Sequence, residues 1–170
     1  MIEIRTERPQ DAATVREVLL QAFGRPQEAD VVDALRLERA DMLSLVAVVE
    51  GHVVGHILFS PAALESKDHT VEGMGLAPLA VVPEHQKKDI GAALVRAGLA
   101  QLENTPCPFV IVLGHPDYYR RFDFEPASRY GIGSEWDVPE DAFMIRMLDE
   151  AAMQGISGVA RYRPEFAKAM

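Results

Sequence analysis

Residues 79–92 read LAVVPEHQKKDIGA, and this stretch decides the expected fold. Its apolar start predicts the end of a strand, and the apolar spacing from Ile90 to Glu103 predicts a helix. A helix N-terminus presents unpaired backbone N–H groups and the positive end of the helix dipole, which together attract phosphate. Lys87 and Lys88 precede this helix, and Gly91 would allow close approach of a ligand. The stretch therefore predicts a site for an anionic ligand; the alternative is an ordinary loop with exposed lysines.

The segments on either side predict a sheet with helices. Apolar runs and turn residues indicate strands over 2–5, 43–49, 53–60, 74–82, 109–113 and 142–148, and helices over 9–23, 28–39, 90–103 and 117–122. We expect Leu64–Thr70 to be a loop, and residues 155–170 show no clear pattern. The strand, helix and strand from Leu76 to Leu113 should form a parallel pair with a right-handed crossover. The expected class is α/β or α+β, with helices on both faces of the sheet.

Pro78 lies inside the strand expected over 74–82. Proline has no N–H group to donate to a ladder, so this strand should bulge or separate from a neighbour at that point. Residues 79–92 contain neither G-x-x-x-x-G-K-[ST] nor G-x-G-x-x-G, which excludes a Walker loop and the dinucleotide fingerprint there.

Length and composition fit one domain over residues 1–170. The chain is 48% hydrophobic and 25% charged, which is typical of a folded globular protein. It has no run of eighteen apolar residues and no signal-peptide pattern at its start, so we expect a cytoplasmic protein that is not in a membrane. The single cysteine, Cys107, excludes an internal disulfide.

The charge balance is acidic. Asp and Glu number 26 against 17 Lys and Arg, giving a formal net charge of −9. This balance argues against general nucleic-acid binding, which depends on neutralising phosphates. It is compatible with a cationic amine as substrate, and equally with a role in solubility alone.

A second stretch, residues 114–124, reads GHPDYYRRFDF. The first stretch resembles the acetyl-CoA signature of the GNAT N-acetyltransferase superfamily, an L-x-V strand followed by P-x-x-Q-x-x-G-x-G/A at the start of a helix. The matching residues are Leu79, Val81, Pro83, Gln86 and Gly91. The second stretch is similar to the G-x-x-x-Y-Y-x-x-F-G-F element of one GNAT branch. The resemblance covers about residues 2–150, and the tail over 159–166 also fits.

The resemblance implies a GNAT-like mixed, centrally parallel sheet with a bulged, splayed strand. It implies acetyl-CoA as co-substrate and an N-acetyltransferase that acts on a primary amine of a small molecule or protein by direct attack. The splayed strand would pair with the pantetheine arm, and an amide there would polarise the thioester carbonyl. The following loop would hold the pyrophosphate. These cofactor residues are Leu79, Ala80 and Val81, then Lys87, Lys88, Asp89, Ile90, Gly91 and Ala92. A homodimer is also compatible with the family.

Tyr119 stands where the family places the tyrosine that protonates the departing CoA thiolate. A phenol keeps its proton at neutral pH and can donate it; the alternative is a partly buried aromatic residue in a short helix. His115 could serve as a general base or only shape a loop. His56 and Glu72 are further candidates for the base, and water can take the amine proton without one.

A metal site and a catalytic cysteine have little support. His115 and Asp117 are spaced like a pair of metal ligands, but no third ligand has suitable spacing, so we expect no metal. Cys107 lies between two prolines just before a strand, where a small core residue is the simpler interpretation.

Two family glycines are replaced by aspartate. Asp123 precedes Phe124, where it would alter only a turn. Asp89 replaces the first glycine of the pyrophosphate loop, where its charge would repel phosphate and its carboxylate could cap the helix in place of the ligand. The alternative function is therefore a catalytically weak or inactive GNAT-fold module for binding or regulation. A structural adaptor of unrelated fold is a third hypothesis.

Overall fold

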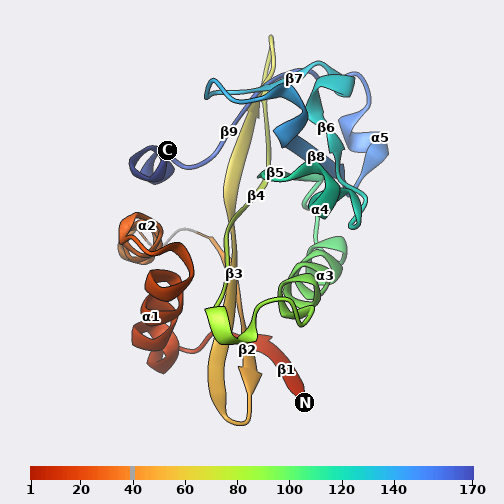
Figure 1. Ribbon diagram of the computed structural model, residues 1–170. Helices are drawn as coiled ribbons and strands as arrows, with labels where there is room; N and C mark the ends of the chain where they lie inside the picture. Colours follow the sequence, from red (N-terminus) through yellow and green to blue (C-terminus); the bar gives the residue numbers. More distant parts are fainter. Residues whose placement is uncertain (39–40) are drawn as a thin grey trace. The chain divides into compact units, whose positions relative to one another are not determined.

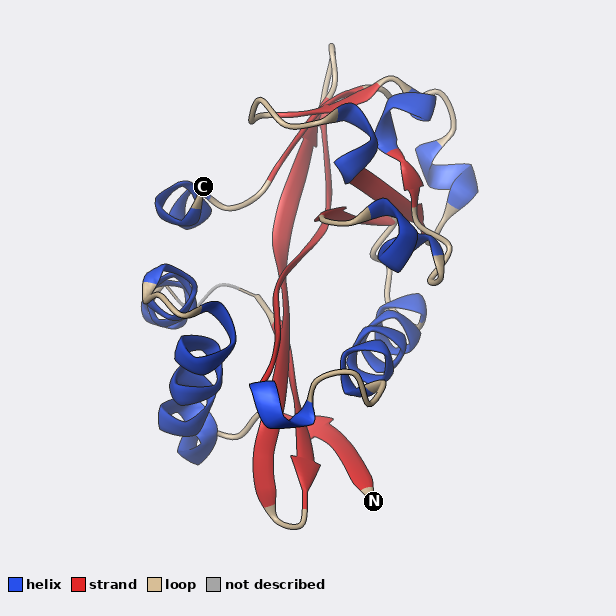
Figure 2. Ribbon diagram, in the orientation of Figure 1, coloured by secondary structure: helices blue, strands red, loops and turns tan. Residues whose placement is uncertain are grey.

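The computed structural model describes residues 1–38 and 41–170, and the contacts within it divide them into two units. The first unit comprises Met1–Phe59, Ala77–Ala100 and Pro164–Met170, and the second comprises Ser60–Leu76 and Gln101–Arg163. Strands β3 (His52–Glu65) and β4 (Thr70–Val81) contribute residues to both units, as does helix α3 (Ile90–Glu103). Figures 1 and 2 show these elements by sequence and by secondary structure.

The first unit is built on antiparallel strands. β1 (Ile2–Thr6) pairs with β2 (Leu43–Val49), and β2 pairs with β3 from Leu43↔Phe59 to Val49↔His52. The register of the second pair shifts between Ala47 and Val48. Residues 45–48 of β2 are buried without the alternation of a half-exposed strand, because helices cover both sides.

The helices of the first unit cover both faces of these strands. Helices α1 (Ala12–Phe23) and α2 (Gln27–Leu37) lie on one side, and α3 lies on the other (Figure 1). Leu19 of α1 and Leu35 of α2 are fully buried, and Ile90 and Leu94 of α3 pack over Gly55 of β3. The short 3-10 helices of the unit are η1 (Pro9–Asp11), η2 (Pro83–His85) and η5 (Pro164–Ala169).

The second unit contains a mixed sheet. β4 pairs with β5 (Phe109–Leu113) in parallel, joining Met74–Leu76 to Val110–Val112. β5 pairs antiparallel with β8 (Phe143–Met147), which also pairs with β6 (Glu125–Pro126). β9 (Gly158–Arg161) pairs antiparallel with β3 and parallel with β7 (Ile132–Ser134). Its helices are α4 (Pro116–Arg120), α5 (Glu150–Met153), η3 (Ala127–Tyr130) and η4 (Glu140–Ala142).

The expected class is confirmed; the differences lie at the ends of elements and in short elements that were not predicted, among them β7 and β9. The sheet is mixed, with a parallel β4–β5 pair, and helices flank the strands of the first unit on both sides. Pro78 follows Leu76, the last residue of the parallel register, by two residues. The loop expected over Leu64–Thr70 is shorter, because β3 continues to Glu65 and β4 begins at Thr70. The predicted helix over 28–39 ends at Leu37 as described, and Arg39 lies outside the described residues.

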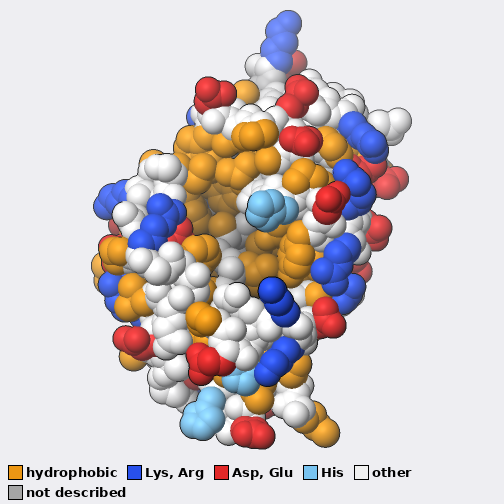
Figure 3. Space-filling view, in the orientation of Figure 1, with side chains coloured by type: hydrophobic (Ala, Val, Ile, Leu, Met, Phe, Trp, Pro, Cys, Tyr) orange, Lys and Arg blue, Asp and Glu red, His pale blue; other side chains and the backbone are white. Residues whose placement is uncertain are grey.

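Two observations bear on the surface. Acidic and basic side chains are interspersed on the face drawn in Figure 3. Among the described residues, no helix has both the length and the apolar composition needed to cross a membrane.

Candidate active site

The predicted cofactor loop leaves the end of β4 in the first unit. Ala80 is buried, while Leu79 and Val81 on either side are half-buried. The N–H of Val82 donates to the carbonyl of Val54 at 2.9 Å, which keeps this end of the strand on β3. The side chain of Gln86 then folds back, and its Nε2 donates to the carbonyl of Val81 at 2.9 Å. The glutamine of the signature thus closes the turn that leads from the strand to the helix.

The next residues have the backbone geometry of glycine. Lys87 and Asp89 have φ angles of 61° and 63°, in the left-handed region that glycine adopts most easily. Asp89 therefore keeps the conformation of the glycine it replaces, since Asp is among the side chains that tolerate this region best. Lys87, Lys88 and Asp89 are all exposed.

The helix that follows offers free backbone donors. The N–H of Ala93 donates to the main-chain carbonyl of Asp89 at 3.0 Å, so α3 begins directly after Asp89. The N–H groups of Ile90, Gly91 and Ala92 precede that first bond and have no partner within the helix. The hydrogen bonds found among residues 1–38 and 41–170 do not include one from any of these N–H groups to the Asp89 carboxylate. The expected capping by Asp89 is therefore not seen.

Tyr119 lies in the second unit and is buried by aromatic neighbours. Its side chain is 9% exposed, on α4 directly after β5. The rings of Tyr118 and Phe124 meet it edge-on, with centroids 5.0 and 5.7 Å away. A Cβ at Gly114 would collide with the Tyr119 ring, so the glycine that opens this motif leaves room for it. Burial raises the pKa of Tyr119, and the neighbouring Tyr118 adds to the shift, so the hydroxyl remains protonated well above neutral pH.

His115 contributes its main chain to the same helix. Its carbonyl accepts the N–H groups of Tyr118 and Tyr119 at 3.1 and 3.2 Å. The imidazole is exposed and makes no capping bond to α4. A role as base therefore stays a prediction, whereas the backbone of His115 clearly fixes the start of the helix that carries Tyr119.

Each motif thus lies where a strand is followed by a helix, as the sequence predicted. A model of the Acetyltransferase (GNAT) domain matches residues 3–127. The chain belongs to the GNAT acetyltransferase family. It is 42% identical over 147 residues to the uncharacterized N-acetyltransferase YjhQ of Escherichia coli K12, covering 85% of this chain and 81% of that protein.

Two solved GNAT structures are similar over almost the whole chain. YhbS of Escherichia coli, solved with CoA, has a TM-score of 0.90 and 32% identity, covering 98% of this chain and 92% of that one. A GNAT acetyltransferase of Brucella melitensis, solved with acetyl-CoA, has a TM-score of 0.79 and 35% identity, covering 98% of both chains. The GNAT fold of this protein, including its mixed sheet, is therefore shown.

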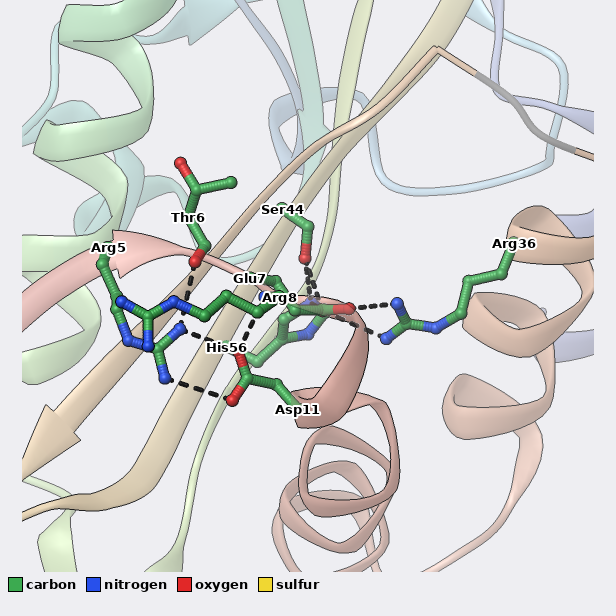
Figure 4. Close-up of polar contacts among 8 residues, drawn as sticks. All are labelled: Arg5, Thr6, Glu7, Arg8, Asp11, Arg36, Ser44 and His56. Carbon is green, nitrogen blue, oxygen red and sulfur yellow. Dashed lines mark hydrogen bonds and ion pairs between the residues drawn. The ribbon is translucent and has the colours of Figure 1, made fainter.

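A buried polar network in the first unit was not predicted (Figure 4). Glu7, directly after β1, is bound by both terminal guanidinium nitrogens of Arg36 from α2. Ser44 of β2 donates its hydroxyl to Glu7 at 2.7 Å and lies 2.9 Å from Nε2 of His56 on β3. Because the only hydroxyl hydrogen of Ser44 is used in the bond to Glu7, the neutral His56 must donate from Nε2 to the Ser44 oxygen. A second pair, Arg5 with Asp11, lies beside it.

The network removes His56 from the candidate bases. The His56 ring is fully buried, and its unprotonated nitrogen Nδ1 has no hydrogen-bond partner among the described residues. Burial lowers the pKa of His56 despite the nearby Glu7 carboxylate, so the ring is neutral at neutral pH. For Glu7, burial opposes ionisation, but hydrogen bonds from His56, Arg36 and Ser44 lower its pKa to about 2. The four residues connect α2 to the strands, and the fully buried ring of His56 is closed to a substrate.

Glu72, Cys107 and Asp117 lie as follows. Glu72 is exposed on β4, and Asp117 is exposed and pairs with Arg120 at 3.6 Å. The thiol of Cys107 is half-buried and donates to the carbonyl of Phe109 at 3.2 Å. Burial raises the pKa of Cys107, which disfavours the nucleophilic thiolate. The described part of the chain contains no group of His, Cys, Asp and Glu able to hold a metal ion.

The second unit also contains a cavity of about 660 Å3 in the region after Phe124. Its walls include Arg129, Tyr130, Met147 and Glu150. Its lining residues, all in the described chain, belong to neither motif, so we do not assign this cavity to acetyl transfer.

One buried residue near Tyr119 was not predicted. Tyr162, just after β9, is 6% exposed, and its hydroxyl donates to the carbonyl of Leu76 at 3.0 Å. In the sequence, only the resemblance of the tail over 159–166 to the family pointed to this residue. The pairing of β9 with β3 brings Tyr162 close to Leu76, and no local sequence pattern predicts a pairing between strands so far apart in the chain.

Proposed function

We propose that this GNAT protein transfers an acetyl group from acetyl-CoA to a primary amine, with Tyr119 as general acid. The observation that carries the proposal is the state of Tyr119: a buried phenol, with a raised pKa, at the position of the family's acid. A group that must deliver a proton late in the reaction has to hold it until then, and burial ensures this.

We further propose that acetyl-CoA binds along the end of β4 and the start of α3. Leu79, Ala80 and Val81 would contact the pantetheine arm. The N–H groups from Lys87 to Ala92 would hold the pyrophosphate. Support comes from the left-handed backbone at Asp89, from the unpaired donors of α3 and from the CoA and acetyl-CoA in the two similar structures. Lys87 and Lys88 add positive charge beside these donors.

In the proposed reaction the amine nitrogen attacks the thioester carbonyl carbon directly. A backbone N–H of residues 79–81 stabilises the negative charge that develops on the carbonyl oxygen. When the carbon–sulfur bond breaks, the Tyr119 hydroxyl gives its proton to the sulfur. The proton lost by the amine passes to water or to the exposed ring of His115, and Tyr119 is reprotonated from solvent.

The competing proposal is a GNAT-fold module with weak or no catalysis, and Asp89 is the observation that favours it. Its exposed carboxylate precedes the donors that the phosphates need. The intact Gln86 turn and the buried Tyr119 favour the enzyme. A titration with CoA separates the two, because an enzyme must bind the cofactor and a module without cofactor affinity does not.

The mechanism is tested with Tyr119→Phe. CoA release from acetyl-CoA is followed with a thiol reagent in a panel of small primary amines and lysine peptides, and kinetics are measured with the best acceptor. We expect turnover to fall by about ten- to a thousandfold, with CoA affinity unchanged, because the lost group acts mainly in the transition state. Tyr130→Phe, which removes an exposed hydroxyl of the same unit, is the matched control. Full activity of Tyr119→Phe would remove Tyr119 from the mechanism.

A further inference from the structure

The Tyr162 hydroxyl lies where the parallel pair of β4 and β5 reaches its last residues. It donates to the carbonyl of Leu76 on β4, and the carbonyl of Ile111 on β5 lies 3.4 Å away. Burial raises the pKa of Tyr162, while a hydrogen bond from the backbone of Leu113 opposes the rise. The hydroxyl thus donates a hydrogen bond to β4 and accepts one from β5. Leu76 is paired with Val112 in the register, so this bridge sits at the final rung.

The rest of Tyr162 is held as firmly as its hydroxyl. A Cβ at Gly75 would lie 2.5 Å from the tyrosine ring, so the ring fills space that only glycine leaves free. The ring of Trp136 stacks on it with a centroid distance of 5.6 Å and an interplanar angle of 23°. The main-chain N–H of Tyr162 donates to Oε2 of Glu135 at 2.8 Å. A side chain fixed from three directions can impose a position on the strand end it touches.

The strand end touched by Tyr162 leads directly to Tyr119. Gly114 follows Leu113, its N–H donates to the carbonyl of Ala142 at 3.0 Å, and the Tyr119 ring rests against its Cα. His115, the next residue, accepts the first hydrogen bonds of α4. A change at Leu113 therefore reaches Tyr119 through two residues of backbone, all within the second unit.

We propose that Tyr162 is a positioning residue for acetyl transfer, which sets the place of the Tyr119 hydroxyl by fixing the end of β5. This inference rests on the proposed role of Tyr119 as general acid. It adds a residue from the far end of the chain to the determinants of catalysis. General acids lose efficiency steeply when displaced, so a small shift of α4 is sufficient to lower turnover.

The variant Tyr162→Phe tests the inference, because it removes the bridging oxygen and keeps the ring. We expect kcat to fall about tenfold with the best amine of the panel, with the KM for acetyl-CoA unchanged within about twofold. Hydrogen exchange at the Leu113 amide should become faster, since that N–H loses its acceptor. The control Tyr130→Phe should change neither kcat nor this exchange. A merely structural role would lower the melting temperature without the selective loss of kcat.

The double variant separates this inference from the proposed function. If Tyr162 acts through Tyr119, then Tyr162→Phe should have no further effect on kcat when combined with Tyr119→Phe. Independent losses that multiply would overturn the inference, as would an unchanged kcat in Tyr162→Phe alone. If Tyr119→Phe keeps full activity, the general-acid proposal fails, and the positioning role fails with it even when Tyr162→Phe is slow. If only Tyr119→Phe is slow, the proposed function stands and the inference is refuted.

Discussion

The exposed Asp89, in the loop proposed to hold the pyrophosphate, gives the sharpest prediction about cofactor binding. Asp89→Gly removes a carboxylate beside the donors of α3 and restores the residue that the backbone favours at a φ of 63°. Relief of the left-handed conformation stabilises the folded protein by about 1 kcal/mol. The greater freedom of glycine in the unfolded chain removes about 0.4–1 kcal/mol. Since no capping bond from Asp89 is seen among the described residues, the melting temperature should change little.

The effect on affinity should be larger. Two unit charges about 5 Å apart repel by about 1 kcal/mol in the dielectric of water and by about 3 kcal/mol at an effective dielectric of about 20. Because Asp89 is exposed, solvent screening places the gain toward the lower value, about 1–2 kcal/mol. This corresponds to roughly five- to thirtyfold tighter CoA binding in Asp89→Gly. Lys87 and Lys88 are present in both proteins, so their attraction cancels in the comparison.

Isothermal titration with CoA at low and high salt measures this difference. The gain should be larger at low salt, because screening weakens the repulsion that is removed. The chain offers a matched control: Asp123 is also exposed, has a φ of 65° and lies outside the cofactor loop. Asp123→Gly should resemble Asp89→Gly in stability and leave CoA affinity unchanged. Equal affinities of wild type and Asp89→Gly at both salt concentrations would refute the repulsion argument.

Two other predictions concern the two units separately. Gly114→Ala should lower turnover, because the new Cβ would collide with the Tyr119 ring; kinetics that match wild type would contradict this packing. In the first unit, the free energy of unfolding should fall as the pH drops below about 6.5, because His56 takes up a proton in the unfolded chain but resists it when buried. It should fall again from about pH 4.5 toward 2, because Glu7 is protonated more easily in the unfolded chain than in the folded protein. Glu7→Gln should flatten the lower part of that curve and destabilise the protein at neutral pH by about 3 kcal/mol, since Arg36 loses the Glu7 carboxylate. Urea unfolding across this pH range measures both effects, and an unchanged acid slope would contradict the assignment.

Local patterns predicted the elements that are set by burial. β2, β5 and α3 have the bounds expected from the sequence, because uninterrupted apolar runs fix the strands and apolar spacing fixes the helix. The C-terminal end of β3 and the start of β4 were missed, since the polar residues of 64–70 suggested a loop where buried Leu64 continues the strand. β7 and β9 were missed because they are three and four residues long and depend on partners distant in the sequence.

The site divides in the same way. The proposed cofactor loop and Tyr119 lie in two continuous motifs, so their positions in the fold could be predicted from the resemblance of those motifs to the family. The contacts around them could not, because Glu7 binds residues 29 to 49 positions away and Tyr162 reaches Leu76 across 86 positions. The backbone at Asp89 is a further case: the sequence shows a lost glycine, and only the structure shows that its conformation is kept.

The central claim is that this protein acetylates a primary amine with Tyr119 as acid, and the transferred acetyl group tests it most directly. The protein is incubated with acetyl-CoA that carries a deuterated acetyl group and with the amine panel, and the products are analysed by mass spectrometry. We predict a labelled amide on at least one amine, formed in proportion to the protein and reduced about ten- to a thousandfold in Tyr119→Phe. CoA binding without any labelled amine, or equal labelling by Tyr119→Phe, would contradict the account.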